Sequence, residues 1–330
     1  MIVDIYTHIL PPAVASALEK LGSGLGIAKR MKAVRDVHDF DSRFRAMDEI
    51  GEYRQIISLP NPPIEAFTTP EQAIDLARIA NDGMADLVRK YPKRFPAFVA
   101  ALPMHEVEPS LAEARRAIDQ LGARGIQLFT NVNGKPIDAA EYAPLFALAA
   151  QYDLPIWLHP TRSAEFPDYT QEKFSRYEMW WCFGWPYETS VAMTRLVFTG
   201  LFDRHPGIKI ITHHGGGMIP FFDKRIENGL AALGGRTKEE DYSGVLGALK
   251  RPFMEYFHNF YADTALFGDS LGLDCALKFF GPDHMVFASD APFGPIKLHT
   301  DAIEARELEA RTHEAIVRRN AEKLMKMTIQ

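Results

Sequence analysis

The stretch IVDIYTH, residues 2–8, has the pattern of a buried strand that carries polar groups at every second position. Successive side chains of a strand point to opposite faces, so we expect Asp4, Tyr6 and His8 to share one face. A polar row inside an apolar strand costs free energy unless something satisfies it. The stretch therefore predicts both a buried strand and a polar site at its end.

Further short apolar or β-branched runs resemble this first one, and they occur at 55–60, 97–103, 125–129, 155–159, 208–214, 259–264 and 285–290. Amphipathic helical patterns separate them, most clearly at 71–90, 109–122, 140–152, 187–205 and 301–327. Strands that alternate with helices predict βαβ units and a parallel sheet. Eight such strands fit a closed α/β barrel, the (β/α)8 or TIM barrel. We predict one barrel domain over 1–330, with loop insertions near 11–42 and 162–186.

An open Rossmann-like sheet is the alternative architecture, and it predicts a GxGxxG turn directly after the first strand. His8 is followed instead by Ile-Leu-Pro-Pro. Gly22, Gly24 and Gly26 spell GxGxG, but no strand precedes them, so we assign these glycines to a loop. The barrel remains the better prediction.

The composition is ordinary for a globular protein, with 47% hydrophobic and 24% charged residues. A formal net charge of −6 gives no electrostatic reason to expect nucleic acid or an anionic membrane as a partner. The sequence shows neither a leader pattern nor an apolar run that could span a bilayer. Two cysteines, Cys182 and Cys275, cannot form a disulfide framework and suit a reducing compartment. We therefore expect a cytoplasmic protein.

The carboxyl ends of barrel strands build the active site in this fold. Here these ends carry a concentration of histidine and aspartate, namely His8, His159, His213, His214, Asp263 and Asp290. Imidazole and carboxylate are the usual ligands of zinc and similar divalent ions. A lone histidine at a strand end is more often hydrogen-bonded structure than a ligand, but closure of a barrel would bring several of these residues together. The pattern therefore predicts a divalent metal site.

His214 begins the segment His-Gly-Gly-Gly-Met-Ile-Pro, residues 214–220. Glycines after a strand leave room for a ligand and tolerate unusual backbone angles. Because His213 precedes His214 in an extended segment, we expect only one of the two to face the barrel axis. The glycine run favours His214.

Three motifs resemble the decarboxylase branch of the amidohydrolase superfamily, which includes aminocarboxymuconate semialdehyde decarboxylase. They are WLHP (157–160), WPYETSVAMTRLVFTGLFDRHPGIKIITHHGGG (185–217) and FASDAPFG (287–294). The similarity covers essentially the whole chain and includes RFRAMDEIG (43–51). It implies a TIM barrel of the metal-dependent hydrolase type and a homodimer.

The resemblance also implies residue roles. The family's first strand carries His-x-His, and both histidines bind a divalent metal together with a strand-five histidine and a strand-eight aspartate. His8, His159 and Asp290 are thus implied as ligands. His214 is implied as the catalytic acid/base, with Asp290 as the other group able to deliver a proton. The first motif histidine is replaced by Tyr6, which departs from the family pattern.

Three interpretations of Tyr6 are open. Its phenol could bind the metal, although a pKa of about 10 makes it a poor ligand. The metal could remain on the other three ligands, with Tyr6 donating a hydrogen bond to substrate, or the metal could be lost. We favour the second interpretation because three protein ligands are typical of a catalytic zinc site. Zinc is therefore the expected metal, and manganese is the alternative.

Arginines could recognise the substrate's carboxylate. Arg162 follows His159 by three positions and could form a bidentate pair, although an ordinary surface role is equally expected. Arg30 and Arg35 lie where the family draws a substrate-binding arginine, and the sequence does not choose between them. Arg43 is expected to make only local ion pairs on its helix.

The sequence thus predicts a metal-dependent decarboxylase, a carbon–carbon lyase acting on a small unsaturated or aromatic carboxylic acid, with the metal as a Lewis acid. The same site could instead serve a hydrolase or hydratase that acts on a lactone, a carbon–carbon bond or a double bond, because fold and ligands do not separate these chemistries. A metal-free binding protein is a further alternative.

Overall fold

The computed structural model describes residues 1–20 and 33–330. Within these residues each of the predicted barrel strands is present. In order around the molecule they are β1 (Ile2–His8), β2 (Tyr53–Ser58), β3 (Ala97–Phe98), β4 (Ile126–Phe129), β7 (Ile156–His159), β8 (Ile210–Thr212), β9 (Tyr261–Asp263) and β10 (Met285–Val286). Their pairings are parallel. A short antiparallel hairpin, β5 (Asn131–Val132) and β6 (Lys135–Pro136), was not predicted.

The strands form two arcs that meet at both edges. One arc has the order β1-β2-β3, and the other has the order β10-β9-β8-β7-β4. A parallel bridge between Ala100 and Ile126 joins β3 to β4. On the opposite side the Ile5 amide donates to the Phe287 carbonyl at 2.9 Å, which joins β1 to β10. The predicted (β/α)8 barrel is confirmed.

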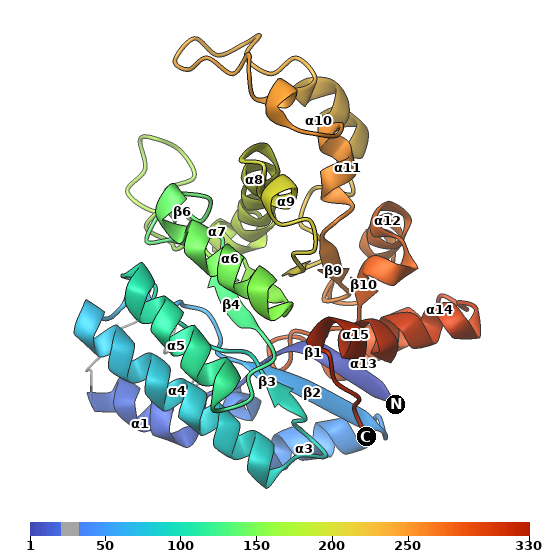
Figure 1. Cartoon of the computed structure of the whole chain (residues 1–330). Coiled ribbons are helices and arrows are strands. Elements are labelled where there is room, and N and C mark those ends of the chain that lie inside the picture. The colour runs from blue at the N-terminus through green and yellow to red at the C-terminus, as the bar shows by residue number, and fades with distance from the viewer. Residues whose placement is uncertain (21–32) are drawn as a thin grey trace.

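Helices surround the strands (Figure 1). They are α1 (Pro12–Lys20), α3 (Phe40–Asp48), α4 (Pro70–Lys90), α5 (Val107–Asp119), α6 (Ala143–Tyr152), α7 (Met179–Cys182), α8 (Gly184–Phe198), α9 (Leu201–Arg204), α10 (Asp223–Leu230), α11 (Phe253–Phe257), α12 (Ser270–Phe280), α13 (Ile296–Glu304), α14 (Ala310–Glu314) and α15 (Asn320–Met325). The predicted helix 187–205 is divided by Gly200, which has a φ of 70°. The predicted helix 301–327 is interrupted between Glu304 and Ala310, and a π-helical turn at Ala315–Arg319 joins α14 to α15.

The amino end of α4 shows how local sequence positions a helix beside the barrel. Thr69 accepts a hydrogen bond from the Gln72 amide, and the Gln72 side chain bonds back to the Thr69 amide. Pro70 occupies the first helical position, where its missing N–H costs nothing. This capping box satisfies two backbone amides that would otherwise lack partners, so the helix begins at a defined residue.

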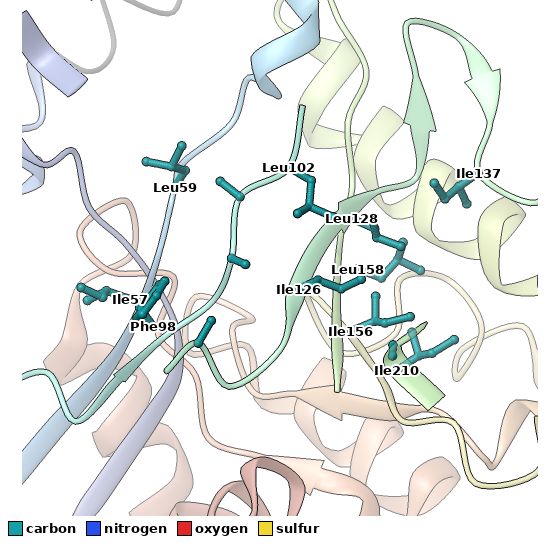
Figure 2. Packing of buried hydrophobic residues seen from close by; sticks show 14 of the residues in the cluster. Ile57, Leu59, Phe98, Leu102, Ile126, Leu128, Ile137, Ile156, Leu158 and Ile210 are labelled. Carbon is teal, nitrogen blue, oxygen red and sulfur yellow. The ribbon is translucent and has the colours of Figure 1, made fainter. Parts of the chain in front are cut away.

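The buried apolar residues divide between the two faces of the barrel wall. Neighbours along a strand fall in different clusters, so Ile57 belongs to the outer cluster and Ile56 to the inner one. Figure 2 shows part of the outer cluster, between strands and helices. The inner cluster also contains Leu324, Met325 and Ile329 from the carboxyl terminus. The last helix therefore closes one end of the barrel and leaves the other end for a site.

A β-bulge in β1 changes the face on which its polar residues lie. Asp4 pairs with Gln55, whereas Thr7 pairs with Ile57, so β1 has one extra residue between these pairs. Such an insertion exchanges the two faces of the strand. Tyr6 lies in the interior as predicted, but Asp4 does not share its face, because Asp4 bonds to Tyr53 of the outer cluster. The prediction of one shared polar face was wrong for Asp4.

Both termini lie against the start of β2, as Figure 1 also indicates. The amino group of Met1 is 3.9 Å from Glu52, and Arg54 donates to the Gln330 carbonyl at 3.1 Å. Both cysteines are free. Among the described helices, none combines the length and apolarity that crossing a membrane requires.

Candidate metal centre

Histidines from three strands converge at the open end of the barrel. His8 ends β1, His159 ends β7, and His213 follows β8 directly. The ring centroids are 5.2 Å apart for His8 and His159, and 5.1 Å apart for His159 and His213. One ring nitrogen from each of the three lies within 4.8 Å of the others. Asp290 faces the same point, because its Oδ1 is 3.1 Å from Nε2 of His8.

Each histidine of the site has its Nδ1 engaged, which determines the role of its Nε2. The acceptors are the Leu59 carbonyl for His8 (3.2 Å), the Pro160 carbonyl for His159 (2.6 Å), the Asp263 carboxylate for His213 and the Ala265 carbonyl for His214 (2.8 Å). An Nδ1–H that donates to such an acceptor leaves the lone pair on Nε2. This is the arrangement by which proteins orient metal-binding imidazoles.

The spacing of these atoms fits a divalent ion. Nε2 of His8 is buried and has no hydrogen-bond partner among residues 1–20 and 33–330, although Asp290 Oδ1 is only 3.1 Å away. Nε2 of His213 is 3.3 Å from the same oxygen. Ligand atoms about 2.1 Å from one zinc ion are about 3.0–3.4 Å apart in octahedral or tetrahedral geometry. His8, His159, His213 and Asp290 are therefore suitable to hold such an ion.

His213 and His214 both face the site, so the expectation that only one could do so was wrong. His214 has a φ of 57°, which breaks the alternation of an extended strand. The two imidazole rings therefore stack, with centroids 3.8 Å apart. Gly217 follows with a φ of 64°, and a Cβ there would lie 2.7 Å from the Pro186 carbonyl oxygen. The glycine run permits a turn that presents both histidines.

Tyr6 lies inside this cluster. Its ring stacks on His213, with centroids 4.0 Å apart and an interplanar angle of 17°. Its hydroxyl is buried and has no hydrogen-bond partner among the described residues. Burial and the charges of Asp263 and Asp290 raise the pKa of Tyr6 well above its usual value, so the group stays a neutral donor. An unpaired buried hydroxyl beside possible ligands is suited to donate to a bound molecule.

The electrostatics of the site favour a cation. Burial alone would raise the pKa of Asp290, but contacts with His213 and His8 hold that pKa well below its usual range. Burial, with neighbouring histidines, lowers the pKa of His159 far below its usual value, so its imidazole is neutral. Burial lowers the pKa of His213, but the buried carboxylates of Asp263 and Asp290 outweigh this effect and raise that pKa to about 9. Buried anions of this kind require a positive partner.

Arg43 fixes the backbone beneath the site. Its guanidinium is buried and donates to the His8 carbonyl at 2.6 Å, to Thr7 Oγ1 at 3.1 Å and to Gln55 Oε1 at 2.7 Å. The prediction of purely local ion pairs was therefore wrong for Arg43. The residue ties α3 to β1 and β2 and so positions the chain that carries His8.

The other predicted arginines lie in different settings. Nη1 of Arg162 is 3.2 Å from Oε1 of Glu188, so a substrate carboxylate would have to replace that partner. Arg35 is largely exposed and pairs with Asp39 at 2.8 Å. Arg30 lies outside the described residues, as do Gly22, Gly24 and Gly26.

Aromatic rings border the histidines. The Trp185 ring lies 5.4 Å from that of His159 and is nearly parallel to that of His214, at 6.4 Å. Phe293 lies 5.7 Å from His8 on another side. Such rings can pack against a planar ligand.

Two residues of the centre, His213 and Asp263, belonged to the strand-end set in the sequence prediction but were assigned no individual role. Asp263 was recognisable as a strand-end carboxylate. His213 was recognisable as a strand-end histidine, but no signal in the sequence shows that it faces the site together with His214, because this depends on the positive φ of His214 itself.

The barrel and its strand-end histidines and aspartates define a metal-dependent hydrolase type of TIM barrel. A family profile described as amidohydrolase matches residues 3–326, so the chain belongs to the amidohydrolase family. The membership indicated by the sequence motifs is confirmed.

Known relatives of this chain include decarboxylases. A 2-amino-3-carboxymuconate-6-semialdehyde decarboxylase from Dictyostelium discoideum is 31% identical over 307 residues, which are 88% of this chain and 81% of that protein. A gamma-resorcylate decarboxylase from Polaromonas sp. is 32% identical over 300 residues, 87% of each protein. The crystal structure of a dihydroxybenzoic acid decarboxylase from Polaromonas sp. JS666, with bound manganese and the inhibitor 2-nitroresorcinol, matches at a TM-score of 0.81 and 28% identity, covering 98% of this chain and 96% of that chain.

Proposed function

We propose that this protein is a metal-dependent decarboxylase of a small aromatic or unsaturated carboxylic acid. One observation carries the proposal: buried Nε2 atoms converge with Asp290 at the open end of the barrel, beside a further histidine that can carry a proton. The decarboxylase relatives, which align over most of the chain, support the same chemistry. The decarboxylase predicted from sequence is therefore retained.

His8, His159 and Asp290 are the proposed ligands. A bound divalent ion would supply Lewis-acid chemistry, polarising a substrate carboxylate or a neighbouring hydroxyl. Imidazole-rich sites suit zinc, which we propose as the resident ion, whereas the Polaromonas structure contains manganese. The site's pair of buried carboxylates suits either ion.

His214 is the proposed proton carrier. Burial and the neighbouring His213 lower the pKa of His214 to about 4, so its Nε2 is free to accept a proton from solvent or substrate. The proton is then delivered to the carbon that bears the carboxylate. The carbon–carbon bond breaks, its electron pair restores the ring or double bond, and carbon dioxide leaves. Asp290 is the second candidate donor, but its low pKa favours the role of ligand.

Tyr6 and Arg162 are the proposed substrate contacts. The unpaired hydroxyl of Tyr6 can donate to a substrate oxygen without binding the metal. Arg162 is paired with Glu188 and would have to release it before binding the substrate's carboxylate. Tyr6 is therefore the stronger assignment.

We infer a homodimer as the working assembly. Aromatic side chains in the segment 166–187 are unusually exposed, including Tyr177 (88%) and Phe183 (69%). Clustered exposed aromatics are typical of protein interfaces. Light scattering coupled to size-exclusion chromatography would give the mass, and a monomer would contradict the inference. The cytoplasmic location stays a prediction.

The function is tested by incubating the metal-loaded protein with hydroxybenzoates, muconate-type acids and lactones. Ultraviolet absorbance follows substrate loss, and released carbon dioxide is measured in parallel. One carbon dioxide per substrate consumed supports the decarboxylase. Turnover without carbon dioxide would indicate a hydrolase or hydratase, and the absence of both turnover and metal would indicate the binding protein.

A further inference from the structure

We propose that His213 is itself a metal ligand and takes the place of the first-strand histidine that Tyr6 replaces. The inference rests on the metal site of the proposed function, but not on the reaction performed there. It adds a third imidazole to the ligands His8 and His159.

The first support is the position of the His213 nitrogen. Nε2 of His213 and Nε2 of His8 lie on the same oxygen of Asp290, at 3.3 and 3.1 Å. The ligand nitrogens of His8, His159 and His213 lie within 4.8 Å of one another. His214 joins His213 and Asp290 in a similar group, but not His8 and His159. His213 therefore belongs to the centre of the cluster, and His214 belongs to its edge.

The second support is the partner on the other ring nitrogen. Nδ1 of His213 bonds to the carboxylate of Asp263. The other oxygen of Asp263 accepts from the amides of Ala265 (3.1 Å) and Gly215 (3.3 Å). Carboxylate–histidine–metal arrangements orient a ligating imidazole and increase its basicity. In His8, His159 and His214 the Nδ1 atom has a main-chain carbonyl as its partner instead of a carboxylate.

The third support is the contact between His213 and Tyr6. The His213 ring is held between Tyr6 at 4.0 Å and His214 at 3.8 Å, both nearly parallel to it. Tyr6 therefore stands where the family has a ligand histidine, and its ring holds the plane of the neighbouring His213 imidazole. The loss of one imidazole from β1 and the presence of another after β8 leave the number of metal-binding nitrogens unchanged.

A purely structural role for His213 is the competing explanation, since a histidine between two carboxylates can also stabilise a fold. The two roles differ in metal affinity and in the number of imidazoles bound to the ion. Neither quantity depends on catalysis, so the inference can fail while the decarboxylase stands, and the reverse also holds.

The experiment titrates chelator-treated protein with zinc against a chromophoric competitor. We expect His213→Gln to weaken zinc binding by at least about 100-fold, and Asp263→Asn by about 10–100-fold. His214→Gln, the matched control from the adjacent position, should keep affinity near the wild-type value. The double variant Tyr6→His/His213→Gln should recover most of the lost affinity. Wild-type affinity in His213→Gln would overturn the proposal, as would failure of the double variant to recover affinity while folded.

A second measurement does not require any variant to fold. X-ray absorption of the zinc-loaded wild-type protein counts the imidazoles on the ion through their scattering pattern. Three imidazoles are expected, from His8, His159 and His213. Two imidazoles would overturn the proposal. Circular dichroism melting of each variant shows whether lost affinity reflects lost structure.

Discussion

Strand β1 carries two buried polar clusters, one on each face of the barrel wall. On the outer face, Asp4 accepts hydrogen bonds from the Tyr53 hydroxyl, the Ser289 hydroxyl and the Ser289 amide. On the inner face, the Tyr6 hydroxyl and the His8 Nε2 have no hydrogen-bond partner among the described residues. Both clusters are almost completely buried, so exposure does not distinguish them. The two clusters differ in how many of their polar atoms have hydrogen-bond partners.

The difference shows how a site can be separated from a structural network. Buried polar groups in folded proteins are nearly always paired, and an unpaired one costs about 1–3 kcal/mol. The polar cluster of Asp4, Tyr53 and Ser289 avoids this cost and stabilises the join between β1, β2 and the segment after β10. The polar groups of Tyr6 and His8 carry the cost of unpaired burial unless an ion or ligand binds. This is the property expected of a binding site.

Removing an inner ligand should have the largest effect. We expect His159→Ala to lose both metal and activity, because it removes one of the imidazoles that converge on the site and a catalytic metal site needs about three protein ligands. Metal content per chain is measured by mass spectrometry, and turnover is measured by carbon dioxide release. Metal at the wild-type level in a folded His159→Ala protein would contradict the assignment of His159 as a ligand.

Removing the proton carrier should preserve the metal. We expect His214→Ala to retain near-stoichiometric zinc and to lose about 100- to 10,000-fold in turnover, the usual contribution of a positioned acid or base. The same two measurements apply. A metal-depleted His214→Ala protein would instead make His214 a ligand.

Removing the unpaired hydroxyl should have a smaller effect. We expect Tyr6→Phe to leave metal content unchanged and to lower turnover by about ten- to a thousand-fold, the range for one well-placed donor. Tyr6→His should bind metal more tightly, because it restores the family's two-histidine motif. If Tyr6→Phe lost its metal, the phenol would be a ligand after all.

The sequence predicted the barrel because each strand run and its flanking helix carry a clear local pattern. It predicted the positions of His8, His159 and Asp290 because strand ends meet at one rim in this fold. It could not predict the bulge in β1, because one inserted residue leaves no compositional mark yet exchanges the faces. Nor could it predict the hydrogen bonds of Arg43, because one of its partners is a main-chain carbonyl 35 residues away.

The combination of His213 with Asp263 was also beyond local reasoning. The pairing depends on the left-handed conformation at His214 and on strand order in the closed barrel, and neither can be read from residues taken one at a time. The two helix divisions differ in this respect. Gly200, with a φ of 70°, divides 187–205 and is a recognisable stop signal, whereas the break within 301–327 contains Glu307 at a φ of 47°, a residue type that does not mark a helix end.

The outer cluster should give the smallest effect on the site and a distinct effect on stability. Asn has the shape of Asp, and in Asp4→Asn its amide can donate to the Tyr53 and Ser289 hydroxyls, which can rotate to accept. Metal content and turnover should therefore stay near the wild-type values. A large loss of metal in Asp4→Asn would show that the two clusters are not independent.

The effect on stability should depend on pH, and its sign follows from the pKa of Asp4. Burial raises that pKa from 3.8 to about 7, against the opposing hydrogen bonds of Ser289 and Tyr53. Because the folded pKa lies above the unfolded one, Asp4 stabilises the fold fully below about pH 4 and loses this contribution as pH rises towards 7.

Asn does not ionise, so Asp4→Asn should be less stable than the wild type at pH 5 by about 1 kcal/mol and should gain relative to it by about 1–3 kcal/mol by pH 8. Urea unfolding of both proteins at pH 5, 6, 7 and 8 measures this difference, in which contributions common to both proteins cancel. A difference that stays constant across these pH values would mean that Asp4 is ionised throughout, held by Arg43 and its hydroxyl partners.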